Sequence, residues 1–126
     1  MLAIEMEPEV RQWLEGLSAA NRGTVKRFVE QLANKGQQVR GPRYKPLGQG
    51  LFEIKFDLDD RTTRITYWLR PDATAVLLTV FHKQKMREGN QVDRARQTMK
   101  TCRSDHTGGP IEVIFAGEPL ELGGPA

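Results

Sequence analysis

The sequence predicts an α+β domain in which a small antiparallel β-sheet is packed by an N-terminal helical hairpin and followed by a C-terminal helix. Apolar residues recur with helical spacing through residues 8–36 and again beyond residue 90. Between residues 51 and 82 they alternate with a period of two, or run together, as they do in strands. The 126 residues, of which 38% are hydrophobic, suffice for one domain with a buried core.

Two helices joined by a tight link are expected first. Pro8 suits the first position of a helix whose apolar residues are Val10, Trp13, Leu14 and Leu17. Ser18 and Asn21 are both possible N-caps for a second helix, which Gly36 would end. Its apolar residues are Val25, Phe28, Val29, Leu32 and Ala33. Residues 37–50 hold two prolines and three glycines, so we expect a loop there.

Three strands are expected next. Residues 51–58 alternate between apolar and polar side chains from Phe52 onwards, and a second strand at 62–70 is ended by Pro71. Residues 75–82 are almost continuously apolar, which is typical of a central strand covered on both faces. A short strand at residues 2–6 is a further possibility.

Asn90 could cap a last helix, whose apolar stripe is formed by Val92, Ala95, Met99 and Cys102. The domain is therefore expected to span residues 1–103. Residues 104–126 would form an acidic tail containing glycine and proline, in which residues 111–115 could add an edge strand.

Net charge divides the chain into three parts. Residues 1–39 have a net charge of zero, residues 40–103 a net charge of +7, and residues 104–126 a net charge of −4. A cationic segment of this size indicates an anionic partner, with RNA or DNA first, although a solvated surface of mixed charge has the same composition. The overall net charge of +3 conceals this gradient.

The cationic segment predicts a charged face on the sheet. If residues 59–60 form a two-residue hairpin turn, Lys55 lies directly opposite Arg64. Like charges in this position are unfavourable, so the pair indicates either an anion-binding site or an open face on which Glu53 and Asp57 neutralise the cations from diagonal positions. The same register places an apolar set on the other face: Phe52, Ile54, Phe56, Ile65, Tyr67 and Leu69.

A second group of cations follows the third strand. Lys83, Lys85 and Arg87 leave the sheet directly after His82. The ordinary pKa of histidine, about 6.5, would allow His82 to give or take a proton near neutral pH. A structural or simply exposed histidine is the alternative interpretation.

Other classes of protein are disfavoured. The single cysteine, Cys102, excludes an intrachain disulfide and a cysteine-based zinc site. No apolar run approaches the roughly 20 residues that a bilayer requires, and acidic residues follow the first methionine closely, so we expect a cytoplasmic protein without a signal peptide. Serine and cysteine nucleophile motifs, glycine-rich phosphate loops and paired-carboxylate spacings are absent. The acids at positions 57, 59 and 60 could suggest a metal, but their strand–turn spacing and the missing loop glycine argue against a calcium site, so no metal and no cofactor are predicted.

Several short motifs stand in a recognisable order between residues 10 and 101. They are Val10-x-x-Trp13-Leu14-x-x-Leu17, Leu32-x-x-x-Gly36, Lys45-Pro46-Leu47-Gly48-x-Gly50-Leu51-Phe52-Glu53-Ile54-Lys55, Arg64-Ile65-Thr66-Tyr67, Val76-Leu77-Leu78-x-x-Phe81-x-Lys83 and Asp93-x-Ala95. In order and spacing the chain resembles the RelE/ParE superfamily of bacterial type II toxins, in particular its HigB-like, phage-derived branch.

This resemblance implies a RelE-like fold and a metal-independent endoribonuclease that needs no small-molecule cofactor. Many members cleave mRNA in the ribosomal A site, and a cognate antitoxin protein blocks them. The implied partners are therefore mRNA, the ribosome and an antitoxin, with no membrane. The implied reaction is attack of a 2′-hydroxyl on the adjacent phosphate, giving a 2′,3′-cyclic phosphate.

The resemblance also implies residue roles. Lys55 and Arg64 match active-site positions and would stabilise charge on the phosphate, although Lys55 stands where this branch usually has Arg and so lacks bidentate geometry. His82 would carry the proton, with Lys55 as its competitor, and Lys83 completes the catalytic set. The implied RNA-binding residues are Lys45, Arg61, Lys85 and Arg87.

Two other functions remain open at this point. A gyrase inhibitor of the ParE type would need no catalytic residues, and an inactive relative would only bind an antitoxin or nucleic acid. The cluster of charged residues at positions 55, 64, 82 and 83 favours the nuclease, because a gyrase inhibitor has no use for it.

Overall fold

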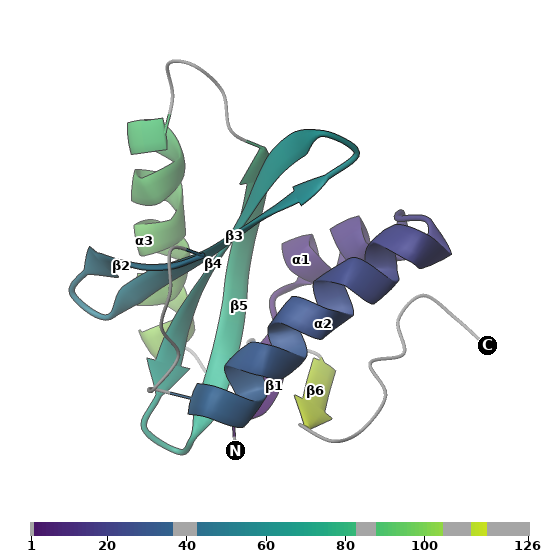
Figure 1. Cartoon of the computed structure of the whole chain (residues 1–126). Coiled ribbons are helices and arrows are strands. Elements are labelled where there is room, and N and C mark those ends of the chain that lie inside the picture. The colour runs from purple at the N-terminus through teal and green to yellow at the C-terminus, as the bar shows by residue number, and fades with distance from the viewer. Residues whose placement is uncertain (1, 37–42, 83–87, 105–111, 116–126) are drawn as a thin grey trace.

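The structure is a computed structural model that describes residues 2–36, 43–82, 88–104 and 112–115, with only the backbone described for residues 88 and 112–115. The elements in this part of the chain are β1 (Ala3–Met6), α1 (Pro8–Glu15), α2 (Ala19–Lys35), β2 (Tyr44–Gly48), β3 (Leu51–Leu58), β4 (Arg61–Arg70), β5 (Thr74–His82), α3 (Glu88–Ser104) and β6 (Glu112–Phe115). The strands form one sheet in the order β2-β3-β4-β5-β1-β6 (Figure 1).

Helices cover both faces of this sheet. Figure 1 shows α1 and α2 on one side of it and α3 on the other. We call the first side the hairpin face and the second the α3 face. The predicted α+β class, with an N-terminal helical hairpin and a C-terminal helix, is confirmed.

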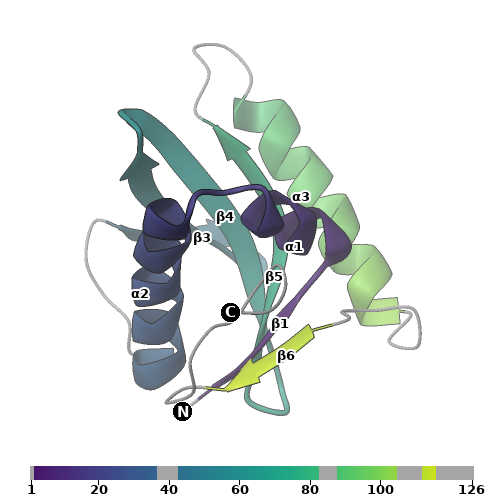
Figure 2. The same cartoon turned by 90° about the vertical axis from the view of Figure 1, so that its right-hand side faces the viewer.

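The sheet is mixed, whereas a purely antiparallel sheet was expected. Strands β2 to β5 are antiparallel neighbours in chain order, but β1 runs parallel to β5 and β6 runs antiparallel to β1. Figure 2 shows β1 and β6 side by side at the edge beyond β5. The parallel pair forms because the N-terminal strand reaches the free edge of β5, where Ile4 and Met6 become fully buried.

The β3–β4 hairpin has the predicted register. Asp59 and Asp60 form the turn with φ values of 51° and 63°, the two positive angles of a type I′ turn. Asp tolerates this left-handed region better than most residues. Lys55 therefore lies opposite Arg64, as expected.

Residues 44–48 contradict the prediction of a loop over residues 37–50. They form β2, an edge strand that pairs with β3. An edge strand accepts Pro46 because it needs hydrogen bonds on only one side. The two glycines that suggested a loop, Gly48 and Gly50, both have positive φ and flank Gln49 in the tight turn between β2 and β3. Residues 37–42 lie outside the described part.

Helix boundaries differ slightly from the expectation. Ser18 is the N-cap of α2, since its hydroxyl oxygen accepts a hydrogen bond from the backbone N–H of Asn21 at 3.2 Å. α3 begins at Glu88, so Asn90 lies within the helix instead of capping it, and the helix ends at Ser104, one residue beyond the expected limit of the domain.

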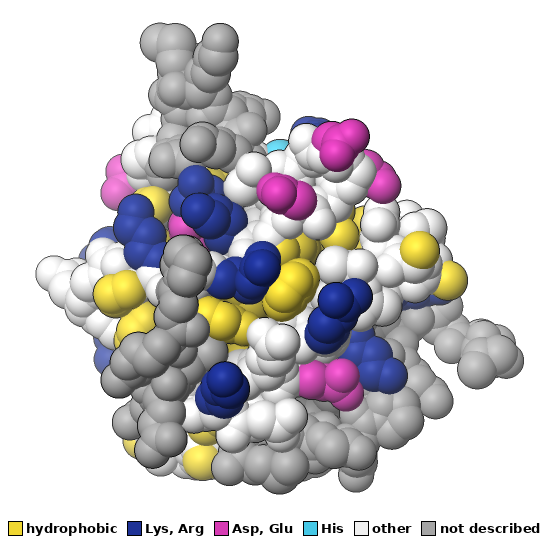
Figure 3. All heavy atoms as spheres, viewed as in Figure 1, with side chains coloured by type: hydrophobic (Ala, Val, Ile, Leu, Met, Phe, Trp, Pro, Cys, Tyr) yellow, Lys and Arg dark blue, Asp and Glu magenta, His cyan; other side chains and the backbone are white. Residues whose placement is uncertain are grey.

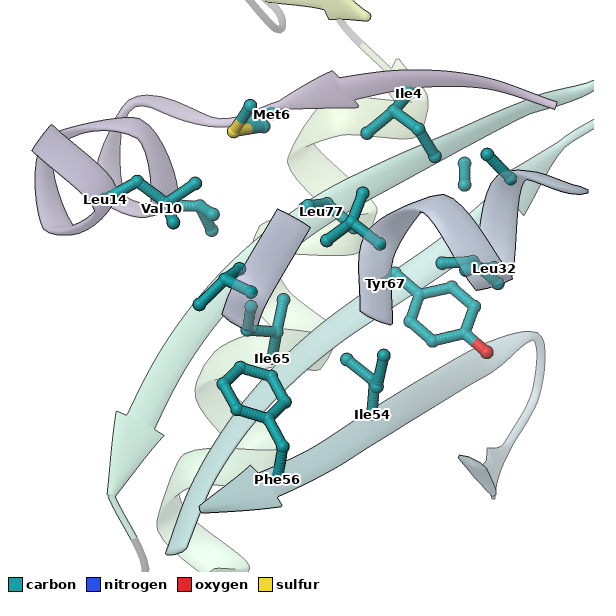
Figure 4. Close-up of a cluster of buried hydrophobic side chains, with 14 of the residues drawn as sticks. Ile4, Met6, Val10, Leu14, Leu32, Ile54, Phe56, Ile65, Tyr67 and Leu77 are labelled. Carbon is teal, nitrogen blue, oxygen red and sulfur yellow. The ribbon is translucent and has the colours of Figure 1, made fainter. Parts of the chain in front are cut away.

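The hairpin face carries the larger core. Buried residues from β1, α1, α2, β3, β4 and β5 form one apolar cluster there, and Figure 4 shows its centre. Phe52 stacks on Tyr67 with ring centroids 5.5 Å apart, and Phe28 of α2 stacks on Phe56 at 5.4 Å. The apolar set predicted for this face therefore packs against the helical hairpin.

A second, smaller core lies under α3. Its buried members are Leu51, Trp68, Val76, Leu78, Ala95, Met99 and Cys102. β5 contributes to both clusters, as predicted for a central strand. Burial raises the pKa of the Cys102 thiol, which keeps it protonated and unreactive near neutral pH.

Candidate functional site

Three cations and one carboxylate share the α3 face. Lys45 lies opposite Glu53 across β2 and β3, and Lys55 lies two residues beyond Glu53 on the same side of β3. Arg64 lies opposite Lys55 on β4. We call these four residues the cation cluster. Its members come from three neighbouring strands, so the antiparallel pairing alone brings them together.

The members of the cation cluster differ in exposure. Lys45 and Lys55 are exposed, whereas Arg64 is 9% exposed and Glu53 only 2%. The Arg64 Nη1 atom lies 2.6 Å from Glu53 Oε1, in a charge-assisted hydrogen bond. The cluster thus consists of a buried ion pair with two exposed lysines beside it.

Glu53 and Asp57 were both considered as acids that neutralise the cations of this face from diagonal positions. The structure shows such an ion pair for Glu53, whereas Asp57 bonds to a threonine. Glu53 pairs with Arg64. Asp57 is exposed, and its carboxylate accepts a hydrogen bond from the Thr62 hydroxyl at 3.1 Å. The face is not open throughout, because α3 covers its other half, including Trp68.

A β-bulge in β5 adjoins the cation cluster. Thr66 lies opposite Thr79, but the next residue, Tyr67, lies opposite Leu77, so Leu78 is an extra residue in β5. The Thr66 and Thr79 hydroxyl oxygens are 2.6 Å apart and fully buried, and Thr66 Oγ1 also accepts the backbone N–H of Thr79 at 3.2 Å. The Thr66 hydroxyl thereby accepts the hydrogen bond of a backbone N–H at the point where the bulge interrupts the regular strand pairing.

The bulge reverses the alternation of β5 and so decides where His82 lies. Phe81 is opposite Arg64 on the α3 face, whereas His82 is opposite Thr63 on the hairpin face. The His82 Nδ1 atom lies 3.2 Å from the Thr63 hydroxyl. The structure therefore does not bring His82 together with Lys55 and Arg64, although all three were predicted to act together.

Two effects lower the pKa of His82. Burial is the larger, because it disfavours the charged imidazolium, and the positive charge of Arg61 adds to it. Arg61 pairs with Leu58, so it too belongs to the hairpin-face side of the β3–β4 hairpin. Of the other predicted site residues, Lys83, Lys85 and Arg87 lie outside the described residues.

Two arginines of α3 that the sequence reasoning did not single out hold this helix in place. Arg96 donates hydrogen bonds to the carbonyl oxygens of Leu47 at 2.8 Å and Gly48 at 3.0 Å. Arg103 lies over the Trp68 ring, 5.1 Å from its centroid. A spacing of seven residues on one helix is the only sequence signal that relates them, and both act in packing.

Charged side chains are unevenly distributed on the side of the molecule that Figure 3 shows. Figure 3 shows Lys and Arg side chains gathered near β2 and α3, and acidic side chains gathered around the β3–β4 turn. Among the described residues, no group of three or more His, Cys, Asp or Glu could hold a metal ion. Within the same residues, no helix is both long and apolar enough to span a bilayer.

The comparisons with known proteins identify the family. Residues 12–100, well over half of the chain, match the family described as phage-derived protein Gp49-like (DUF891). The protein belongs to this family, which is associated with toxin–antitoxin systems. The match includes the whole cation cluster and ends within α3, so β1 and β6 lie outside it. No curated protein and no solved structure matches the chain significantly.

Proposed function

We propose that this protein is the toxin of a type II toxin–antitoxin system and acts in the cytoplasm as a HigB-like, metal-independent mRNA endonuclease. The observation that carries the proposal is the exposed Lys55 directly opposite Arg64, with Lys45 on the same face. Cross-strand like charges are unfavourable for folding, and a polyanion relieves that repulsion. Membership of the Gp49-like family supports the toxin class and an antitoxin partner.

The reaction requires positive charge more than it requires a metal. The 2′-hydroxyl oxygen forms a bond to phosphorus as its proton leaves, and the bond from phosphorus to the 5′-oxygen breaks as that oxygen gains a proton. Negative charge grows on the phosphate oxygens in the transition state, where fixed cations stabilise it. In this proposal Lys55 and Arg64 stabilise that charge, and Lys45 binds the neighbouring backbone phosphate.

The two candidate proton carriers, His82 and Lys55, lie on opposite faces of the sheet. His82 lies on the hairpin face, so it would serve only a substrate that reaches around the end of β5. Lys55 is exposed and adjacent to the proposed phosphate site, which makes it the better placed of the two candidates.

Inducible expression tests the proposal. We expect the wild type to arrest growth and to cut cellular mRNA, as seen by primer extension. Lys55→Gln combined with Arg64→Gln should lower cleavage about a hundredfold or more, because the loss of even one charge-stabilising donor has an effect of this size. Lys55→Gln alone, at an exposed position, separates loss of function from loss of folding.

A matched control removes the same charge elsewhere. Arg22→Gln with Lys35→Gln neutralises two cations of α2, away from the cation cluster, and should leave cleavage unchanged. Equal cleavage by the wild type and the Lys55/Arg64 double variant would contradict the proposal. Intact transcripts with broken chromosomes would indicate a gyrase inhibitor instead.

One observation favours a second candidate, a relative that binds an antitoxin or nucleic acid without cutting it. Arg64 is engaged in a buried ion pair and His82 faces away, so only Lys45 and Lys55 of the cluster are exposed. Two exposed lysines suffice to bind a phosphate backbone but do not assemble an acid and a base. Under this alternative, transcripts remain uncut and growth continues.

A further inference from the structure

The buried carboxylate of Glu53 occupies the centre of the cation cluster. It lies directly opposite Lys45 on β2, two residues from Lys55 on β3, and diagonal to Arg64 on β4. It is 2% exposed, although carboxylates are almost never buried unless they are paired. Three cations and one carboxylate leave the cluster with a net charge of +2.

The ion pair fixes the position of the guanidinium. Lys55 lies directly opposite Arg64 and repels it, so an isolated Arg64 side chain would move toward solvent. The 2.6 Å contact with Glu53 holds it against the sheet instead, with the Arg64 side chain 10% exposed and the Glu53 side chain 3% exposed. A buried ion pair contributes little to the free energy of unfolding compared with apolar packing. Stability alone therefore does not explain this pair, and a role in the site is the better explanation.

The other acid on this face does not share this arrangement. Asp57 is exposed and accepts a hydrogen bond from Thr62. Glu53, in contrast, contacts Arg64, a cation of the cluster.

We infer that Glu53 is a positioning residue for the proposed phosphate site. It holds Arg64 in one orientation beside Lys55, so that two cations of different strands address the same phosphate. The inference rests on the proposed function, since it assigns a role in that reaction. The Glu53 carboxylate should also lower the affinity of the protein for RNA, because it repels the phosphates that the cations attract.

This loss of RNA affinity allows a positioning role of Glu53 to be distinguished from a role in which Glu53 only balances the charge of the cluster. Glu53→Gln raises the charge of the cluster by one, so binding of a fluorescein-labelled single-stranded RNA should be as tight as in the wild type or tighter. If Glu53 positions Arg64, the same variant should nevertheless lower kcat for mRNA cleavage in a reconstituted translation system at least tenfold. Glu53→Asp, which keeps the charge, should recover part of that loss.

The control is a second ion pair at the other end of the sheet, in which Arg70 also binds Asp72 at 2.9 Å. Arg70 Nη1 lies 2.7 Å from Glu5 Oε2, with side chains 17% and 13% exposed. Glu5→Gln should leave kcat and RNA binding at wild-type values. Thermal unfolding of each variant verifies that it is folded.

A double variant keeps the test decisive if Glu53→Gln does not fold. Glu53→Gln with Arg64→Gln removes both charges and so leaves no buried charge without its partner. If Glu53 acts through Arg64, the double variant should cleave at the rate of Arg64→Gln alone. A double variant that cleaves more slowly than Arg64→Gln alone would overturn the inference. If Glu53→Gln does fold, wild-type kcat in that variant would overturn it as well.

Failure of the proposed function has a different signature. A wild type that cuts no mRNA contradicts the nuclease itself, and with it the role of Glu53. A wild type that cuts mRNA, together with a Glu53→Gln variant that cuts it equally, contradicts the positioning role and leaves the nuclease standing.

Discussion

The two faces of the sheet differ in what they bury. Among the described residues, the hairpin face buries sixteen in one apolar cluster, whereas the cluster under α3 has seven. The remainder of the α3 face buries polar pairs instead, Glu53 with Arg64 and Thr66 with Thr79. Apolar burial supplies most of the free energy of folding, so the hairpin face stabilises the domain and the α3 face can hold charges in a fixed arrangement.

Adjacent leucines of β5 test this comparison most directly. Leu77 belongs to the hairpin-face core and Leu78 to the core under α3, and both are fully buried. Replacement of a buried leucine by alanine costs about 2–5 kcal/mol of unfolding free energy, depending on how far the surroundings relax. We expect Leu77→Ala near the upper limit and Leu78→Ala near the lower, because a single helix can settle more easily than two helices. Urea unfolding measures both, and an equal or larger loss for Leu78→Ala would contradict the comparison.

A polar link between the two faces should have a smaller effect. Glu9 of α1 accepts the backbone N–H of Val80 at 3.0 Å and contacts Arg94 of α3 at 2.5 Å. The Arg94 guanidinium also donates to the Val80 carbonyl oxygen at 3.4 Å. These two side chains thus bond to the backbone N–H and carbonyl groups of β5 that lie beyond the end of β1. Glu9→Gln should lower the free energy of unfolding by about 1 kcal/mol.

Another glutamate of the same helix is the control for this link. Glu15 forms only a partly exposed pair with Arg11, at 3.3 Å. Glu15→Gln should cost about 0.3 kcal/mol, as exposed pairs within a helix do. Equal thermal midpoints for the two variants would show that Glu9 does not join α1 to β5 and α3.

The smallest effect concerns pH. The pKa of His82 is lower in the folded protein than the ordinary value of about 6.5, so the unfolded chain binds the proton more readily. Stability is therefore at its full value above the unfolded pKa and is lost as the pH falls from that value through the lower pKa of the folded state. The thermal midpoint of His82→Gln should therefore decrease less than that of the wild type between about pH 7.5 and 5.5. Parallel pH profiles for the two proteins would show that His82 titrates normally in the folded state.

The part of the site that could be predicted is local in sequence. A two-residue turn at Asp59 and Asp60 determines the whole register of β3 and β4, and with it the opposition of Lys55 and Arg64. The position of His82 could not be predicted in the same way. Leu77 and Leu78 are both apolar, so nothing in the pattern marks the bulge that turns His82 to the other face.

Long-range contacts account for the other differences. Pro46 and two glycines indicated a loop at β2, because sequence alone does not reveal that this segment is an edge strand, where proline is tolerated. The parallel pairing of β1 with β5 joins segments about seventy residues apart, a contact that no local pattern specifies.

By itself the sequence determined the helical hairpin, the three central strands and the charged pair, since hydrophobic periodicity and turn residues act over short distances. Only the tertiary structure decided which charges are buried. In the folded protein Arg64 and Glu53 form a buried ion pair, while Lys45 and Lys55 stay exposed. Burial depends on what covers a residue, and the covering segments come from distant parts of the chain.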